Sequence, residues 1–426
     1  MKENKFIYES PNNGKTIYRR PFNQPHSTRE LVDNTPFSWP LMKDCITDED
    51  KTSMIDFIKN TSRLTNGPKV KEFEQKWSEW LGCKYSLFVS SGSTANTLLV
   101  AAMKEKYGLK NGDKVIVPCI TWVTNISPVM QLGLQPIFCD IDPKTFSFDL
   151  NNLKQIAKDH PEVKMVFVTH LFGISADIDA YKEIFPNALF IEDVCESHGT
   201  TYKGKKCGTL SEGSTFSSYF GHHMTTVEGG FVCTNDKELY NLMKVKRSHG
   251  MAREALPEKF EEYKNQYPDI HPQFMFVTDG YNLRSMEINA VLGLSQLKRL
   301  DANNQRRRQV FTQFIDIVNQ YPEHFISDYQ VEGNSSFCLP FICKSSEFKS
   351  DLEKYLNEYK VETRPLCSGN LLRQPFLQRE NTPLPENYPT AEFLHENGFF
   401  IGNNHLITDD EITTLRHLID SFINEN

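Results

Sequence analysis

Between residues 85 and 193 short apolar runs alternate with helical patterns, and this alternation limits the possible fold more than any other feature of the sequence. Runs rich in Val, Ile and Phe predict strands at 85–89, 114–117, 136–140, 164–169 and 188–193. Helical patterns lie between them, at 97–106, 123–131, 150–158 and 177–184. Repeated strand–helix units predict an α/β fold with a largely parallel sheet and helices on both faces.

The rest of the chain divides around this unit. Residues 1–35 are polar and rich in Asn, Pro and Arg, so we expect an N-terminal arm there. Residues 36–284 are expected to form the large domain, and residues 285–426 a smaller one. A long helical region is predicted from 285 to about 321 as the bridge between the two domains. In the smaller domain strands at 336–343 and 361–365 are predicted to alternate with helices at 348–359 and 409–424.

The charge of the chain argues against a nucleic-acid partner. Lys and Arg total 47 and Asp and Glu total 55, which gives a net charge of −8. A nucleic-acid surface would need clustered basic residues. The largest basic run is Arg306-Arg307-Arg308, and its helical, charge-mixed surroundings predict a solvated helix face.

The sequence predicts neither a secretory signal nor a membrane span. The N-terminus has no apolar run, and the longest uncharged run, 115–139, is interrupted by Pro118, Pro128 and Pro136. The ten cysteines show no repeated short spacing, which is typical of a reducing compartment rather than of a disulfide framework. We therefore expect a cytoplasmic protein.

Small polar residues follow the first predicted strand. The segment 90–96, SSGSTAN, joins this strand to a Leu-rich helix. Backbone N–H groups and hydroxyls in such a turn point toward one spot at the positive end of the helix, where a phosphate can bind. An ordinary helix N-cap explains the same residues equally well. Both interpretations stay open at this point.

Two other segments contain candidate site residues. Asp193 ends the apolar run 188–193, and the carboxyl ends of parallel strands face the crevice where α/β proteins bind ligands. A helix-capping aspartate is the alternative. His222 and His223 lie in the polar part of segment 216–230. Taken alone, paired histidines are more often packed or solvated than catalytic, and no H-E-x-x-H or close Cys/His spacing predicts a metal site.

Taken together, several segments resemble one family. They are SSGSTAN at 90–96, IVPCITW at 116–122, EDVCESHGT at 192–200, GSTFSSYFGHHMTTVEGG at 213–230, RSHG at 247–250, GYNLRSMEINAVLGLSQLKRL at 280–300, ETRPLCSGNLLRQP at 362–375 and NGFFIGNNH at 397–405. The chain resembles the sugar aminotransferase/dehydratase family that uses pyridoxal phosphate (PLP). The resemblance implies the aspartate aminotransferase type of fold, with a large, mixed, mostly parallel sheet domain and a smaller α+β C-terminal domain.

The resemblance also implies how the cofactor phosphate would be held. Gly92, Ser93 and Ser217 match phosphate-binding positions of the family, in agreement with the turn at 90–96. Asn282 matches a phosphate contact that is donated by a second subunit. A homodimer with a shared active site is therefore implied.

Three residues match positions around the cofactor ring. Trp122 would stack on the pyridine ring, and Asp193 would pair with the ring nitrogen, which keeps the ring an electron acceptor. Glu196 would lie next to the ring hydroxyl. Three polar residues match a region near the substrate, where surface roles are equally compatible with them: Arg364, Asn370 and Arg373.

The chain departs from most of the family at His222, where a lysine usually forms a Schiff base with the cofactor. An imidazole cannot hold the cofactor in this way, but with an unperturbed pKa of about 6.5 it can accept and donate protons near neutral pH. The resemblance thus implies a 3-dehydratase that works with PLP and its amine form, pyridoxamine phosphate (PMP). His223 would support its neighbour.

The implied reaction uses L-glutamate as amino donor and converts a nucleotide-linked 4-keto-6-deoxyhexose into a 4-keto-3,6-dideoxy sugar, of the kind used in O-antigen. GDP-4-keto-6-deoxy-D-mannose is the expected substrate, and a CDP-linked sugar stays open. Three alternative functions would require different residues. A sugar aminotransferase would need lysine at position 222, and a catalytically silent regulator would not need Trp122, Asp193 and Ser217. An iron–sulfur relative would need cysteines soon after the histidine, but only Cys233 lies between residue 222 and Cys338.

Overall fold

The computed structural model describes residues 37–378 and 382–425, together with Pro25 and three short strands near the N-terminus. These strands are β1 (Phe6–Glu9), β2 (Ile17–Pro21) and β3 (Glu30–Val32), and they pair as an antiparallel sheet. The remainder of the predicted arm, 1–35, lies outside the described residues.

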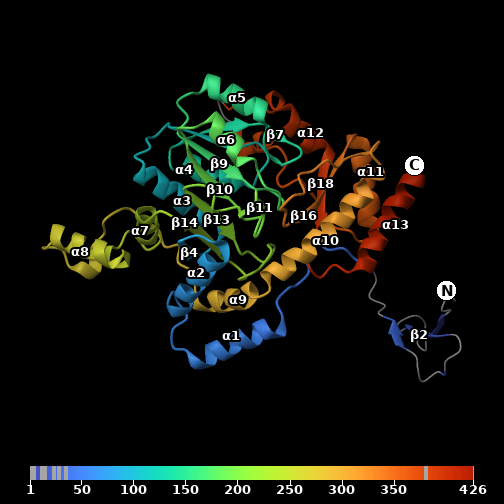
Figure 1. Cartoon of the computed structure of the whole chain (residues 1–426), viewed down its shortest axis with the longest axis horizontal. Helices are drawn as coiled ribbons and strands as arrows, with labels where there is room; N and C mark the ends of the chain where they lie inside the picture. The colour runs from blue at the N-terminus through green and yellow to red at the C-terminus, as the bar shows by residue number, and fades with distance from the viewer. Residues whose placement is uncertain are drawn as a thin grey trace.

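A seven-stranded sheet forms the centre of the molecule (Figure 1). Its strands are β4 (Tyr85–Val89), β5 (Lys114–Pro118), β6 (Gln135–Cys139), β9 (Met165–Thr169), β10 (Leu189–Asp193), β13 (Gly213–Ser217) and β14 (Gly230–Thr234). They lie in the order β4-β14-β13-β10-β9-β5-β6. Strands β13, β10, β9, β5 and β6 are parallel, whereas β14 is antiparallel to both β13 and β4. The predicted mixed, mostly parallel sheet is confirmed.

Helices cover both faces of this sheet. They include α2 (Pro68–Leu81), α3 (Gly92–Lys106), α4 (Ser127–Gln131), α5 (Leu150–Asp159), α6 (Ile178–Ile184) and α7 (Lys237–Lys246). In β9, Met165 and Phe167 pack in the core cluster that contains α3, α4 and α7, while Val166 and Val168 pack in the cluster that contains α5 and α6. Burial on both faces explains why these strands read as continuous apolar runs.

A second, antiparallel sheet lies in the C-terminal part. Its strands are β15 (Phe325–Ile326), β16 (Cys338–Cys343), β18 (Gly398–Gly402) and β17 (Thr363–Pro365), in that order. The associated helices are α10 (Leu300–Val318), α11 (Ser346–Glu358), α12 (Pro389–Asn397) and α13 (Asp409–Glu425). Strand β18 and helix α12 were not predicted from the sequence.

The long helical region predicted from 285 to about 321 is present, but it consists of two helices, α9 (Glu287–Leu297) and α10, with a short break between them. Arg299 has φ −114° and ψ 3° at the break. Its guanidinium forms an ion pair with the buried Asp50 of α1 (Asp48–Asn60), with Nη1 at 2.9 Å from Oδ1. The break coincides with this tertiary contact, in a stretch where the helical periodicity of the sequence continues.

The prediction that the basic run 306–308 forms a solvated helix face is wrong. Arg307 is fully buried, and the two arginines beside it are half-buried. The Arg307 guanidinium donates to the carbonyl oxygens of Phe337, directly before β16, and Asn403, directly after β18, which lie at the same end of these two paired strands. Sequence spacing alone does not show that α10 turns this charge into the interior.

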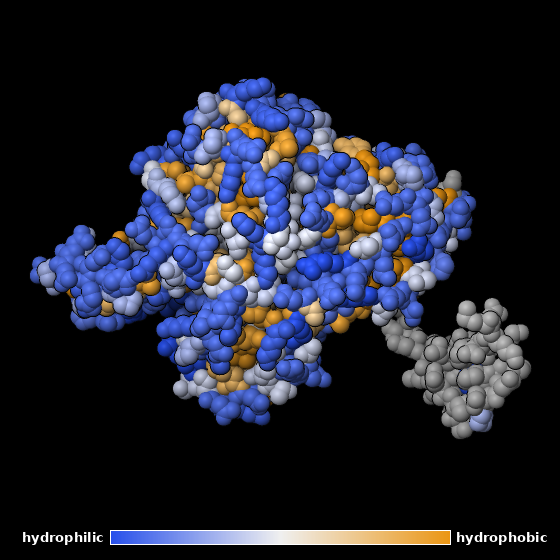
Figure 2. All heavy atoms as spheres, viewed as in Figure 1, coloured by the Kyte–Doolittle hydropathy of each residue, from blue (hydrophilic) through white to orange (hydrophobic). Residues whose placement is uncertain are grey.

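Between α7 and α9 the chain forms a projection, which contains α8 (Pro257–Gln266), extends from one side of the body (Figure 1) and is mostly hydrophilic (Figure 2). Helix α8 has no buried residue. Two separate two-stranded antiparallel sheets are also present. One consists of β7 (Ile141–Asp142) and β8 (Ser147–Phe148), and the other of β11 (Thr201–Tyr202) and β12 (Lys205–Lys206). Among the described residues, none of the helices has the length and apolar character needed to cross a bilayer.

Candidate active site

A cavity of about 600 Å³ lies at the carboxyl ends of β5, β9, β10 and β13. This is the position where open α/β sheets bind ligands. Seven of the eight predicted site residues line it: Gly92, Ser93, Trp122, Asp193, Glu196, Ser217 and His222. The eighth, Asn282, is exposed and is not part of the lining in this chain; its Oδ1 accepts a hydrogen bond of 3.0 Å from Nε of Arg284.

The turn at 90–96 forms a cradle at the start of α3. Ser91 is the N-cap: its Oγ accepts from the Thr94 N–H at 3.1 Å, and Thr94 Oγ1 accepts from the Ser91 N–H at 3.0 Å. The N-cap interpretation is therefore correct for Ser91. The first N–H groups of a helix have no intrahelical partner, so those of Gly92 and Ser93 are available at the cavity.

Gly92 allows Ser217 to approach this helix end. A Cβ atom at position 92 would lie 2.5 Å from Ser217 Cβ and 3.0 Å from Ser217 Oγ. A side chain would thus fill the space beside the Ser217 hydroxyl. Free amide groups, a hydroxyl and the positive end of a helix fit a phosphate group.

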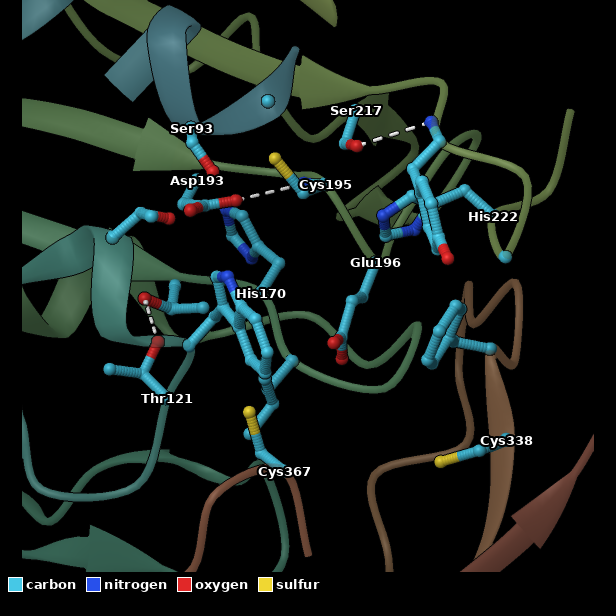
Figure 3. A pocket seen from close by; sticks show the side chains of 18 of the residues that line it. Ser93, Thr121, His170, Asp193, Cys195, Glu196, Ser217, His222, Cys338 and Cys367 are labelled. Atoms are coloured by element: carbon cyan, nitrogen blue, oxygen red, sulfur yellow. Dashed lines mark hydrogen bonds between the residues drawn. The ribbon is translucent and has the colours of Figure 1, made fainter. Parts of the chain in front are cut away.

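Asp193 is buried at the end of β10, on the opposite side of the cavity from His222 (Figure 3). Its Oδ2 accepts from Nδ2 of Asn96 at 2.8 Å and of Asn125 at 3.0 Å, and its Oδ1 accepts from the Cys195 N–H at 2.9 Å. Asp193 therefore does not cap a helix. Its hydrogen-bond partners in the described chain are all uncharged, so its negative charge is available to a cationic ring nitrogen.

Sequence reasoning missed the two asparagines. The Asn96 amide is oriented by the Thr215 hydroxyl, which donates to Asn96 Oδ1 at 2.6 Å. Both asparagines are fully buried. A polar side chain on the buried face of a first helical turn is a signal that could have identified Asn96.

Trp122 and Glu196 form other parts of the wall. Trp122 is 55% exposed although it is large and apolar, so its indole is free to stack on a ring in the cavity. Glu196 lies between Asp193 and His222 (Figure 3), and its Oε2 accepts from the Phe172 N–H at 3.2 Å. Burial raises the pKa of Glu196 to about 7, the Phe172 hydrogen bond opposes this rise, and the charge of Asp193 adds to it.

His222 lies on the turn after β13, where its backbone N–H donates to the Tyr219 carbonyl at 3.0 Å. Its ring centroid is 5.4 Å from that of Phe337, and its Nδ1 is buried without a hydrogen-bond partner. Burial and, second, the charge of Arg307 lower the pKa of His222 to about 3. The imidazole is thus neutral at pH 7, which corrects the expectation of an unperturbed pKa.

His223 does not line the cavity. It is buried, with Nε2 at 3.2 Å from both the carbonyl oxygen and the hydroxyl of Ser335. Of the three arginine and asparagine residues matched to the substrate region, only Arg364 lines the cavity. Asn370 donates to Glu392 at 2.7 Å, and Arg373 pairs with Glu392 as well.

The C-terminal part closes the cavity with side chains that the sequence did not identify: Phe337, Cys338, Cys367 and Phe400. Their runs read as ordinary strands or loops, although Cys367 and Phe400 lie in segments that carry the resemblance. In residues 37–378 and 382–425 no group of three or more His, Cys, Asp or Glu side chains has the arrangement of a metal site.

The sheet order, the phosphate-type cradle and the buried Asp193 define a class of protein, that of the aspartate aminotransferase type of fold. The chain matches the DegT/DnrJ/EryC1/StrS aminotransferase family over residues 45–420 and belongs to this family. The resemblance inferred from the sequence is confirmed.

Curated relatives include dehydratases and a synthase. GDP-4-keto-6-deoxy-D-mannose 3-dehydratase of Yersinia pseudotuberculosis is 37% identical over 383 residues, which cover 87% of this chain and 96% of that protein. GDP-perosamine synthase of Escherichia coli O157:H7 is 27% identical over 394 residues, which cover 91% of this chain and 99% of the relative.

Solved structures agree with the sequence relatives. The chain is similar to E. coli GDP-4-keto-6-deoxy-D-mannose-3-dehydratase with bound hydrated PLP, with a TM-score of 0.82 and 32% identity over 90% of this chain and 99% of that one. It is also similar to GDP-4-keto-6-deoxymannose-3-dehydratase with a trapped PLP-glutamate geminal diamine, with a TM-score of 0.81 and 32% identity over 89% of this chain and 100% of that one.

Proposed function

We propose that this protein is a PLP/PMP-dependent 3-dehydratase of a nucleotide-linked 4-keto-6-deoxyhexose, with GDP-4-keto-6-deoxy-D-mannose as its substrate and L-glutamate as amino donor. One observation carries the proposal: His222, and no lysine, lines the described part of the cavity opposite Asp193. The names of the relatives at 35–37% identity support the same reaction.

The residues of the cavity fit the cofactor. Gly92, Ser93 and Ser217 would hold its phosphate, Trp122 would stack on its ring, and Asp193 would hold a proton on the ring nitrogen. When bound in its amine form, the cofactor supplies a nitrogen that condenses with the C-4 keto group and a ring that accepts an electron pair. Glu196 would lie beside the ring hydroxyl, where its raised pKa allows it to donate or accept a hydrogen bond.

His222 would carry a proton. Because its ring is neutral at pH 7, it can accept a proton from a carbon acid in the cavity, and a bound anion would oppose the depression of its pKa. Loss of the 3-hydroxyl as water requires one proton on the leaving oxygen. One side chain within reach of both positions is sufficient, because the proton that it removes is the proton that it returns.

The same proposal includes a homodimer in the cytoplasm. Asn282 is exposed in the segment that precedes α9, where it could reach a second subunit. Apolar side chains gather at the surface over α1 and α9 (Figure 2), and Ile55, Ile58 and Met286 are each at least 50% exposed there. An exposed apolar patch of this kind supports an interface between copies. Residues 36–284 would form the cofactor-binding domain, and residues 285–426 the smaller domain.

An aminotransferase of the same family is the alternative. It would need a lysine that forms the Schiff base with the cofactor, and none of the described residues that line the cavity is a lysine. In Asp193 a carboxylate is buried with three hydrogen bonds, in a cavity beside a phosphate-type cradle. Burial of a carboxylate costs free energy, and in a silent regulator that binds no cofactor this cost would serve no function.

The test is a mass-spectrometric assay of the purified protein with PLP, L-glutamate and a GDP- or CDP-linked 4-keto-6-deoxyhexose. We expect a sugar product lighter by one oxygen atom, together with ammonia and 2-oxoglutarate. His222→Lys should abolish this product, whereas His271→Lys, at an exposed position on the projection, should leave it unchanged. An amino sugar from the wild type, or no reaction with either nucleotide, would contradict the proposal.

A further inference from the structure

Two cysteines, Cys83 and Cys233, lie beside one hydroxyl group at the edge of the main sheet. Cys83 follows α2 and precedes the edge strand β4, and Cys233 lies on the neighbouring strand β14. Ser86 of β4 is the ladder partner of Cys233, so both side chains lie on the same face of the sheet, against α2. The Ser86 Oγ is 3.3 Å from Cys83 Sγ and 3.4 Å from Cys233 Sγ. One oxygen atom thus contacts both thiols.

The Ser86 hydroxyl can stabilise a thiolate at Cys83. Ser78 Oγ donates to Ser86 Oγ at 2.8 Å, which leaves the single hydrogen of Ser86 for one of the two sulfur atoms. When Cys83 is ionised this hydrogen is donated to it, because a hydrogen bond to a charged acceptor is the stronger one. The neutral Cys83 thiol can donate to the Tyr85 carbonyl oxygen at 3.5 Å, which is a weak hydrogen bond.

Cys83 is accessible, whereas Cys233 is not. Cys83 is half-buried and lines a cavity of about 900 Å³, and Cys233 is fully buried behind it. Most of the charged side chains that line this cavity are basic, and positive surroundings favour a thiolate. The titratable residues of the lining other than Cys83 are Arg63, Lys71, Lys84, Lys244, Arg247, Arg253 and Arg284, with the acids Glu74, Glu79 and Glu254 and the phenols Tyr85 and Tyr240.

The two thiols also differ in ionisation. Hydrogen bonding with the Cys233 thiol lowers the pKa of Cys83 to about 6, burial opposes this change, and Ser86 and Ser78 add to it. Burial raises the pKa of Cys233, and it does the same for Cys195 and Cys367, the other half-buried cysteines of the described chain. An accessible thiolate beside a second, buried thiol is typical of a cysteine pair that reacts with peroxide.

We propose that Cys83 and Cys233 form an oxidation site, at which hydrogen peroxide oxidises Cys83 and Cys233 then closes a disulfide. In the first step the Cys83 thiolate attacks one peroxide oxygen: an S–O bond forms, the O–O bond breaks, and hydroxide leaves. In the second step the Cys233 sulfur attacks the sulfur of the Cys83 sulfenic acid. The S–S bond forms, the S–O bond breaks, and the oxygen departs with the Cys233 proton as water. The peroxide is reduced and the two thiols are oxidised.

The chain around Cys83 can accommodate the new bond. An S–S bond of about 2.05 Å requires the two sulfur atoms to approach each other. Cys83 lies between the exposed Gly82 and Lys84, ahead of β4, so it can move without breaking the strand ladder. Both thiols are free in this structure, and in a reducing compartment the disulfide would form only transiently. The inference concerns these thiols alone and does not rest on the dehydratase function.

The first test compares alkylation rates in the full-length, cofactor-loaded protein. Iodoacetamide at pH 7, followed by mass spectrometry of tryptic peptides, should modify Cys83 at least about fourfold faster than Cys195 and Cys367. The larger thiolate fraction of Cys83 outweighs the lower nucleophilicity of a more acidic thiol. Ser86→Ala should raise the midpoint of the pH profile of Cys83 alkylation by about one pH unit, and Ser86→Thr, which keeps the hydroxyl, should leave it unchanged. Equal rates at the three cysteines would overturn the inference, as would an unmoved midpoint in Ser86→Ala.

The second test treats the same protein with hydrogen peroxide. We expect a tryptic peptide that joins Cys83 to Cys233, lighter than the two separate peptides by two hydrogen atoms and converted back to them by dithiothreitol. In Cys233→Ala no cross-link can form, so dimedone should trap a sulfenic acid at Cys83. In Cys83→Ser the buried Cys233 should stay unoxidised. Cys343→Ala, at a buried cysteine of β16, is the matched control and should still give the cross-link.

Circular dichroism and cofactor absorbance show whether each variant is folded and loaded, and neither Cys83 nor Cys233 lines the active-site cavity. If a variant does not fold, the wild-type protein decides by itself. Oxidation of Cys83 to a sulfinic acid without the cross-link would overturn the inference. Oxidation of Cys195 or Cys367 ahead of Cys83 would overturn it as well.

Discussion

The contact between Gly92 and Ser217 allows a sharp test of the cradle. In Gly92→Ala the new methyl carbon would lie 2.5 Å from Ser217 Cβ, whereas non-bonded carbons are most favourable at about 3.5–4.0 Å. The turn must therefore open by about 1 Å. Overpacking of this kind costs about 1–3 kcal/mol, and replacing glycine by alanine in an unstrained position returns about 0.4–1 kcal/mol. A net loss of about 1–2 kcal/mol follows.

This loss should appear twice. Thermal unfolding of the cofactor-free protein should show a melting temperature lower by about 2–4 °C. Titration with PLP or PMP, followed by absorbance, should show affinity reduced by about 5–30-fold, because 1.4 kcal/mol corresponds to a factor of ten.

Ser217→Gly removes the atoms that clash and separates the two effects. The double variant should recover most of the lost stability but not the cofactor affinity, because the Ser217 hydroxyl is then missing. The reasoning is refuted if the double variant is as unstable as Gly92→Ala. It is equally refuted if Gly92→Ala binds the cofactor as the wild type does.

Two other variants test the buried polar groups. Asn96→Leu removes one donor from Asp193 and the acceptor of the shorter Thr215 hydrogen bond, which leaves the hydroxyl only the Glu192 carbonyl oxygen at 3.4 Å. The free energy of cofactor binding, measured by the same titration, should weaken by about 1.5–3 kcal/mol. An affinity equal to that of the wild type would contradict the role of Asp193. The pKa of Glu196 is about 7 in the folded protein against 4.5 for the free side chain; the folded state then binds more protons, and this group lowers stability as pH rises from about 4.5 to 7. Glu196→Gln should remove up to about 3 kcal/mol of this decrease in the free energy of unfolding. The measurement is urea unfolding of the cofactor-free wild type and variant at pH 5 and pH 8. An equal decrease in both proteins would refute the raised pKa of Glu196.

The site illustrates where sequence reasoning was sufficient. Small residues at 90–96, a carboxylate that ends a buried strand and the histidine at 222 are each adjacent to the end of a strand in the sequence. Because the sheet is parallel there, these strand ends meet at one edge, and the residues converge on one cavity. The pattern could not decide whether Ser91 is a cap or a ligand, since a capped helix start leaves the next N–H groups available for an anion.

The break between α9 and α10 and the burial of Arg307, which the sequence did not predict, have a common physical cause. At the break between α9 and α10, Arg299 contacts Asp50, which is 249 residues away in sequence. The burial of Arg307 depends on the loops that contain Phe337 and Asn403. Helical periodicity is a local property, and it contains no information about which partner a side chain meets across the fold.

The sequence by itself determined the α/β class, the strand ends that build the site and the family, because these follow from local periodicity and from short motifs. Only the tertiary structure decided that Asn96 and Asn125 hold Asp193, that His222 lines the cavity while His223 is packed behind it, and that His222 is neutral. The physical reason is that burial and the distances between charges set protonation and hydrogen bonding, and both arise only when distant segments pack together.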